Sequence, residues 1–284
     1  MRRYSGFKLA AVVASALLLG ACGGGGGSER PDFTPTPPPP PPPPPAPPAP
    51  FGVTSDAEFP AFGDIAGLRW DESSKSYEIR LAEADWQRLT FVDSSQGGEH
   101  YAPDSTYFVF FREGPHEYTG WATLHENAWG FQIGQFAYGL PTADGDVPTT
   151  GAASFEAEVR GVGVSTDPSA GHQYDVTGEA RLNFDFGAGA LTGYMDARLT
   201  GPLGTTFDAP RYEFADTVFS VGSTTFSGNF AAPGASADSF FSGRFNGPQA
   251  AELMAHWRAP FIDTTGQPFI YGTMSGIWIG RRAD

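Results

Sequence analysis

The chain has 284 residues, a formal net charge of −15 at pH 7, 14% aromatic residues and a single cysteine. Acidic residues outnumber basic ones and no basic stripe is present to displace counterions from phosphates, so nucleic acid is not an expected partner. A single cysteine excludes an intramolecular disulfide, so the folded part must be held together by its core alone.

Residues 1–21 are predicted to be a signal peptide. Arg2, Arg3 and Lys8 form a basic start, and the apolar run 9–19 that follows is too short to span a membrane comfortably. Removal of these three basic residues takes the formal charge from −15 to −18. Such a charge should keep the protein soluble on a crowded surface, or attract a basic partner protein.

The signal ends in Leu-Gly-Ala-Cys, which resembles the processing site of bacterial lipoproteins. In that site small residues admit the peptidase, and the thiol of the cysteine, here Cys22, receives the lipid, such as palmitate. Gly23 stands where an acidic residue would favour retention in the inner membrane, so the outer membrane is the expected destination. The alternative is an ordinary secretory signal that leaves a cysteine behind.

Residues 22–50 are predicted to form a disordered stalk behind the lipid anchor. Five glycines at 23–27 make a flexible joint, and the proline-rich run 35–50 favours polyproline II. At about 3.1 Å per residue this run alone could hold a domain about 50 Å from the membrane. A docking site for a reader of PxxP motifs is the alternative.

The rest of the chain is expected to be all-β, because aromatic and glycine residues are frequent and helical periods are few. Residues 51–136 are predicted to form a small β-rich subdomain with strands at 77–81, 88–92, 107–111, 118–124 and 130–140. The aromatic run 107–111 should be buried on both faces or lie at an interface.

Residues 137–284 are predicted to form an eight-stranded antiparallel β-barrel whose interior is filled by side chains. The strands are expected at 152–163, 174–186, 191–200, 205–214, 217–230, 240–246, 250–259 and 268–279. In the hairpin 240–260 the alternation places Phe241, Phe245 and Trp257 on one face, and Asn246-Gly247-Pro248 forms the turn.

Two runs in this half resemble the barrel of the transferrin-binding-protein-B-like surface lipoproteins. The first is the F-x-G-x-F-x-G-P-x-A-x-E hairpin motif, carried by Phe241, Gly243, Phe245, Gly247, Pro248, Ala250 and Glu252. The second is a G-x-A-x-L-x-x-D-F-G-x-G-x-x-x-G run, carried by Gly178, Ala180, Leu182, Asp185, Phe186, Gly187, Gly189 and Gly193. The start of the barrel is similar too, with Phe155 in place of the family's tyrosine. The resemblance covers about 137–279, half of the chain.

This resemblance implies that residues 51–136 correspond to the handle subdomain that precedes the barrel. It also implies a surface-exposed receptor without catalytic activity, which binds a host or environmental protein, iron carriers above all, beside an outer-membrane transporter. The family often has two lobes and this chain has one, which puts a bilobal iron carrier in doubt as the ligand. The alternative function is a periplasmic lipocalin-like lipoprotein that carries an apolar small molecule in its barrel.

No residue is expected to be catalytic, and no cofactor or metal is expected. The histidines never fall at metal-ligand spacing, since the His-Glu neighbours at 116–117 and 125–126 point to opposite faces of a strand. They are expected to be solvated surface residues, with an axial haem ligand as the alternative. The five positions are His100, His116, His125, His172 and His256.

Aromatic residues near the start of the barrel are the candidate binding residues. Trp121, Trp129 and Tyr138 are singled out, because Trp and Tyr carry much of the energy at interfaces. The alternative is that they belong to the core of the N-terminal subdomain. The barrel loops expected to make contacts are 165–173, 201–206, 231–239 and 260–267.

Overall fold

The computed structural model describes residues 49–81, 84–95, 98–102, 107–111, 114–125, 132–166, 173–201, 204–231, 239–265 and 269–283. The signal segment, Cys22 and nearly all of the stalk lie outside these ranges. Within them the chain is all-β, as predicted, and its helical turns are the short 3₁₀ helices η1 (Pro50–Gly52) and η2 (Pro248–Ala250). No helix of this part is long and apolar enough to cross a bilayer.

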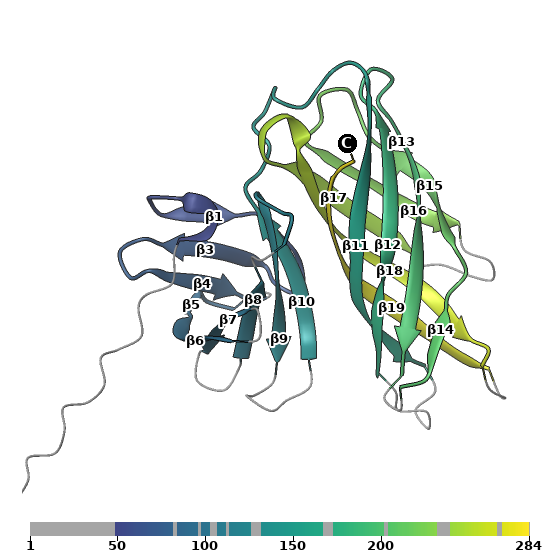
Figure 1. The fold of residues 1–284 in the computed structure, drawn as a ribbon, viewed down its shortest axis with the longest axis horizontal. Helices are drawn as coiled ribbons and strands as arrows, with labels where there is room; N and C mark the ends of the chain where they lie inside the picture. The colour runs from purple at the N-terminus through teal and green to yellow at the C-terminus, as the bar shows by residue number, and fades with distance from the viewer. Residues whose placement is uncertain are drawn as a thin grey trace, which may run out of the picture. The chain divides into compact units, whose positions relative to one another are not determined.

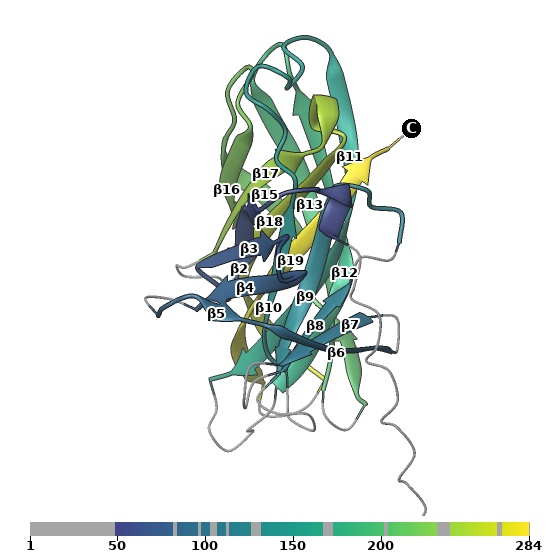
Figure 2. The ribbon, with the colours of Figure 1, turned by 90° about the vertical axis from the view of Figure 1, so that its left-hand side faces the viewer.

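The N-terminal subdomain, here termed the handle, contains two antiparallel sheets (Figures 1 and 2). The first sheet has the order β1 (Ala57–Phe59), β3 (Gly67–Asp71), β4 (Ser76–Arg80) and β5 (Gln87–Arg88). The second has the order β2 (Ala61–Gly63), β10 (Gln132–Gly139), β9 (Thr119–His125), β8 (Tyr107–Phe111), β7 (Gly98–Ala102) and β6 (Thr90–Ser95). Strand β10 continues three residues past the predicted end of the handle at position 136.

One aromatic core joins the two sheets of the handle. Tyr77 of the first sheet stacks on Phe110 of the second, with ring centroids 4.3 Å apart and planes 8° apart. Its hydroxyl lies 3.3 Å from that of Tyr138, so two buried polar atoms satisfy each other. The handle is therefore a small sandwich held by rings that each bury a large apolar area.

The aromatic run of β8 confirms the prediction that it is covered on both faces. Phe108 and Phe110 are fully buried in the handle core. On the opposite face Phe111 stacks on Trp121, with ring centroids 4.0 Å apart. Strands β1, β2, β3 and β7 were not predicted, because they are short and include glycine, aspartate and glutamate, which weaken any periodic pattern.

The C-terminal half is a closed antiparallel barrel of eight strands, as predicted, with the short β14 (Thr206–Asp208) beside β13. In ring order the strands are β11 (Ala152–Ser165), β12 (Gln173–Asp185), β13 (Ala190–Thr200), β15 (Tyr212–Val218), β16 (Thr225–Ala231), β17 (Phe240–Asn246), β18 (Glu252–Asp263) and β19 (Ile270–Arg282). The last strand pairs with the first and closes the ring.

The fourth and fifth strands differ from the prediction. The segment 205–214 is divided between β14 and the start of β15, because Pro210 lies between them and cannot donate to a ladder. The predicted strand 217–230 contains the turn between β15 and β16. Asp216 has a positive φ of 47°, and the register shifts between Ala215 and Val218, so a β-bulge interrupts β15 before its last residue.

The ring has one weakly paired seam, between β13 and β15. Their ladder consists of the pairs Tyr194–Glu213 and Met195–Tyr212. Side chains reinforce it, because Arg211 forms an ion pair with Asp196, and the hydroxyl of Thr217 donates to the carbonyl of Leu191 at 2.8 Å. Toward the loop end, the pairs of β13 with β14 and the bond from the Ala209 N–H to the Ala197 carbonyl continue the backbone pairing, so side chains supplement a short ladder here.

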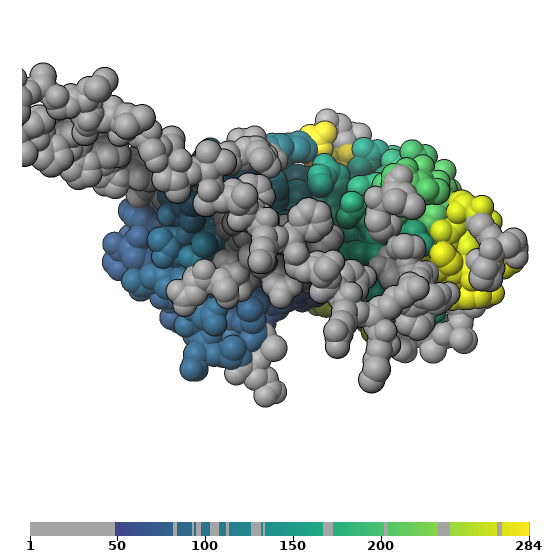
Figure 3. All heavy atoms as spheres, turned by 90° about the horizontal axis from the view of Figure 1, so that it is seen from below, coloured from purple at the N-terminus to yellow at the C-terminus, as the bar shows by residue number. Residues whose placement is uncertain are grey.

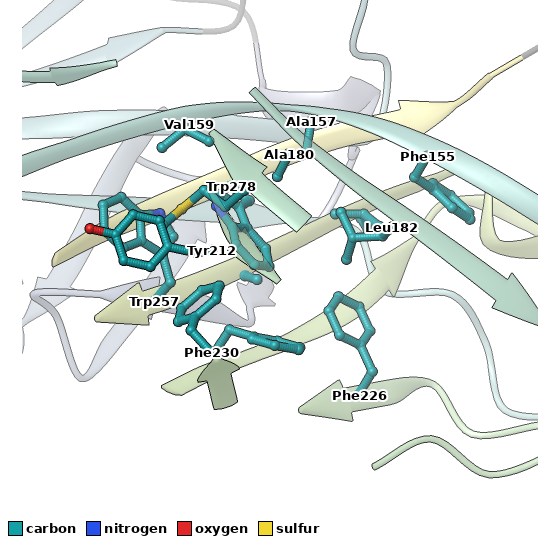
Figure 4. Packing of buried hydrophobic residues seen from close by; sticks show 14 of the residues in the cluster. Phe155, Ala157, Val159, Ala180, Leu182, Tyr212, Phe226, Phe230, Trp257 and Trp278 are labelled. Atoms are coloured by element: carbon teal, nitrogen blue, oxygen red, sulfur yellow. The ribbon is translucent and has the colours of Figure 1, made fainter. Parts of the chain in front are cut away.

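Alternation along the strands fills the barrel interior with large apolar side chains, and Figure 4 shows them pointing toward one another. The predicted inward residues Phe241, Phe245 and Trp257 are each at most 1% exposed, as are Phe184 and Phe186 of the neighbouring motif. The filled interior is therefore confirmed at these positions. It leaves no support for the apolar-carrier alternative, which needs an open cavity inside the barrel.

Adjacent phenylalanines in β17 test this register, because Phe241 is 1% exposed and Phe240 is 38% exposed. Phe241→Ala should lower the free energy of unfolding by about 3–5 kcal/mol, since it opens a cavity beside Trp278. Phe240→Ala should cost less than about 1 kcal/mol, because that ring lies on the outside. Denaturant titrations of both variants measure the difference, and equal losses would contradict the register.

Candidate functional site

The candidate site lies on the outer face of four neighbouring barrel strands, β17, β18, β19 and β11. It comprises the side chains that point away from the barrel core, and the strand register arranges them in rows. From the η2 end to the opposite end the rows are Asn246–Glu252–Arg281–Glu156, Arg244–Met254–Ile279–Glu158, Ser242–His256–Ile277–Arg160, Phe240–Arg258–Ser275–Val162, Pro260–Thr273–Val164 and Ile262–Tyr271.

In the first row, the buried carboxylate of Glu252 attaches the handle to the barrel. The backbone N–H groups of Glu117 and Tyr118 donate to its two oxygens at 2.6 and 3.1 Å. His116 Nδ1 lies 3.8 Å from the same carboxylate. Burial alone would raise the pKa of Glu252, but the hydrogen bonds from His116, Glu117 and Thr119 outweigh it and hold the pKa below its ordinary value.

Further hydrogen bonds surround this carboxylate. Asn246 Nδ2 donates to Thr119 Oγ1 at 3.0 Å, and Thr142 Oγ1 donates to the carbonyl of Gly247 at 2.7 Å. Gly247 has a φ of 70°, and a Cβ there would overlap the ring of Tyr118, so only glycine fits. Glu252 and Gly247 belong to the hairpin motif noted in the sequence. In this chain those two motif positions form the contact with the handle.

Below this row an apolar layer separates the handle from the barrel. Ala137 of β10 packs with Met254, Ile277 and Ile279 of the outer face, and all four are buried. Trp121 lies at the edge of this layer, between the ring of Phe111 and the guanidinium of Arg160, which lies 4.2 Å from the Trp121 ring centroid.

The predicted binding residues therefore have different environments. Trp121 is partly buried and already contacts the barrel, and Tyr138 is fully buried in the handle core. Both environments match the alternative in which these rings are structural. Trp129 lies outside the described residues, as does the predicted lipidation site Cys22.

Where the handle no longer covers the outer face, a groove of about 530 Å³ opens between the two parts. His256 forms one wall, with its ring 5.2 Å from that of Phe62 and 5.3 Å from that of Phe240. Burial lowers the pKa of His256, although the nearby charge of Asp64 opposes this effect. The imidazole is therefore neutral at pH 7.

At the far edge of the groove, after the row that holds Arg258 and Ser275, the outer face carries exposed apolar side chains. Val164 is 58% exposed and Tyr271 is 55% exposed, and Phe269, just before β19, is 45% exposed. Val164 and Tyr271 lie on adjacent strands, and the N–H of Thr166 donates to the carbonyl of Tyr271 at 2.8 Å. This exposed apolar strip is the surface that the sequence analysis did not identify.

The four loops predicted to make contacts emerge at this same end of the barrel, because each connects the same ends of antiparallel strands. They join β11 to β12, β13 to β14, β16 to β17 and β18 to β19. Figure 1 shows these strand ends at the bottom of the barrel, and Figure 3 views the molecule from below, where yellow residues of the last strands reach the surface. Most of the loop residues lie outside the described ranges.

The expectation of solvated surface histidines is wrong for three of the five. His100 and His256 lie on strands, the first 8% exposed and the second in the wall of the groove, and His116, in the loop between β8 and β9, lies against Glu252. His172 falls outside the described residues. In the part of the chain that the structure describes, no three His, Cys, Asp or Glu side chains gather as a metal site would require.

Glu252→Gln should destabilise the protein at pH 7 by about 1.5–3 kcal/mol, because two N–H groups lose a charged acceptor. The folded pKa of Glu252 is depressed, so its contribution is present above the ordinary value of 4.5 and is lost as the pH falls through the folded pKa. The difference in unfolding free energy between wild type and variant should therefore shrink below pH 4.5. Glu179→Gln, on an exposed strand position, is the control and should change little. A pH-independent difference would contradict this role.

Comparison with known proteins gives structural neighbours only. No protein-family model matches the chain, and no curated protein matches it. Transferrin-binding protein B of Haemophilus parasuis is similar over 80% of this chain and 45% of its own, at 15% identity and a TM-score of 0.49. The Neisseria meningitidis protein is similar over 80% and 44%, at 13% identity and 0.47.

A structure described as a surface lipoprotein is similar over 79% of this chain and 99% of its own, at 11% identity and a TM-score of 0.33. The chain spans about half the length of the transferrin-binding proteins that it matches.

Proposed function

We propose that this chain is a lipoprotein of the bacterial outer membrane that faces the outside of the cell and binds a protein without catalysing a reaction. Cys22 would carry the lipid, and the Gly/Pro-rich stalk would hold the folded part away from the membrane. The exposed apolar strip and the loops beside it would form the contact. An outer-membrane transporter is the proposed second partner, to which the captured protein is presented.

The observation that carries this proposal is the apolar strip of Val164, Tyr271 and Phe269. The same outer face is buried under the handle near η2, and beyond the handle it continues with exposed apolar side chains. Neighbouring exposed apolar side chains on a soluble domain mark sites of protein association. Tyr at such a site is well suited to bind, because its ring is apolar and its hydroxyl can still bond to water or a partner.

The motif resemblance supports an iron-carrier protein as the first ligand to test. The chain has a net charge of −15, so a basic partner would be attracted to it and would associate faster. The alternative of a periplasmic carrier of an apolar molecule has less support, because large side chains occupy the barrel interior.

Protease treatment of intact cells tests the location. Full-length protein with a tag after Asp284 should be cut away from whole cells, because the stalk would extend it outward. A periplasmic marker protein must survive in the same cells, and lysed cells show that the protease can cut the domain. Survival until the outer membrane is broken would refute the surface location and favour the periplasmic alternative.

Removing the apolar strip tests the binding surface. Val164→Ser with Tyr271→Ser should weaken binding of an iron-carrier protein, transferrin first, by more than about tenfold if these side chains are energetic centres of the contact. Val218→Ser is the matched control, because Val218 is 63% exposed on β15, outside this face. Surface plasmon resonance with immobilised protein measures both. Equal affinity for the double variant and the control would refute this surface.

A further inference from the structure

We propose that the groove between the handle and the barrel is a binding site for a small aromatic carboxylate. The groove shares Val164 with the protein-binding strip, but the proposal concerns a different kind of ligand and does not depend on the proposed function. It rests on three features of the groove: its size, its apolar walls, and the hydrogen-bond donors that line it.

The groove has the size and shape expected for a small ligand. Its volume of about 530 Å³ lies within the range of about 300–1,000 Å³ that is typical of small-molecule sites. Its floor includes Gly276, and the Trp257 ring packs so closely beneath Gly276 that a Cβ there would overlap it.

The walls of the groove favour a flat, apolar molecule. Val162 and Val164 line one side, and the contacting rings of Phe240 and His256 line the other. Because burial keeps His256 neutral at pH 7, its imidazole contributes an aromatic surface and no charge. An aromatic ring between these walls would gain both burial and ring contacts.

The polar groups of the groove favour a negative charge on that molecule. Arg258 and the hydroxyl groups of Ser275 and Thr273 line the groove, and none has a hydrogen-bond or ion-pair partner among the residues that the structure describes. Arg258 and Ser275 are cross-strand neighbours on the outer face. A guanidinium beside a hydroxyl is a suitable partner for a carboxylate, which accepts but does not donate.

The hydrogen-bonding groups on the handle side of the groove are only partly satisfied. Asp64 accepts the backbone N–H of Gln135 at 2.8 Å, and its own N–H donates to the carbonyl of Gln135 at 3.1 Å. The side-chain oxygen of Gln135 accepts from Gln132 at 3.5 Å. The Nε2 of Gln135 is buried without a partner on this side, but the Asp64 carboxylate lies beside it and would repel an anion. The carboxylate of the ligand should therefore face Arg258, and its ring should face Phe240 and His256.

The test uses 2-naphthoate and its neutral amide, 2-naphthamide, with the full chain carrying Cys22→Ser so that no lipid competes. Isothermal titration should show one saturable site for 2-naphthoate, with 2-naphthamide about tenfold weaker, because it lacks the charge that meets Arg258. Arg258→Gln should weaken 2-naphthoate about tenfold and change 2-naphthamide less than about twofold. Ser275→Leu should abolish binding of both, because it fills the groove.

Arg281→Gln is the matched control, since it removes an exposed arginine from the same outer face, in the row nearest η2. It should leave both affinities unchanged. Near-ultraviolet circular dichroism checks the fold of Ser275→Leu. If that variant does not fold, the affinities of 2-naphthoate and 2-naphthamide for the wild type and for Arg258→Gln still test the proposal. Equal affinity of acid and amide for the wild type, or an undiminished affinity for 2-naphthoate in Arg258→Gln, would overturn the proposal.

Discussion

The architecture depends on one buried carboxylate. Glu252 receives two successive backbone N–H groups of the handle, so a single side chain of the barrel satisfies donors that would otherwise be buried without partners. Around it, the hairpin turn at Gly247 and the side chain of Asn246 complete a polar junction next to the apolar layer of Met254, Ile277 and Ile279. The position of this junction near η2 determines which part of the outer face is covered and which part stays free.

The groove and the exposed strip are consequences of that placement. The same four strands carry an interface, a groove and an open surface in successive rows, because the handle covers only the rows nearest the junction. The hairpin motif of the sequence thus has two structural roles in this chain. Its phenylalanines fill the barrel, and its Gly247 and Glu252 hold the handle.

Local alternation predicted the barrel interior, since Phe241, Phe245 and Trp257 share one face of a hairpin with an evident turn. The outer face was harder to predict, although one sign was present. Met254, Ile277 and Ile279 make β18 and β19 apolar on both faces, which indicates strands covered on both sides. What covers them could not be predicted, because Glu117 and Glu252 are 135 positions apart and meet only when the handle docks. No local period encodes that contact. Short strands such as β1 and β2 were missed for a related reason, since their pairing partners, and not their own residues, make them strands.

The seam between β13 and β15 gives the barrel a mechanical asymmetry. The β13–β15 ladder has two residue pairs, supplemented by the Arg211–Asp196 ion pair and by packing around Phe214, and the neighbouring β15–β16 ladder is interrupted by a bulge. Backbone ladders resist separation cooperatively, but a side-chain closure can yield one contact at a time. The pairing of the ring is therefore weakest on the two sides of β15. Local opening should begin at that seam, far from the junction with the handle. Strands β13 and β15 can then separate while the strands beneath the handle stay paired.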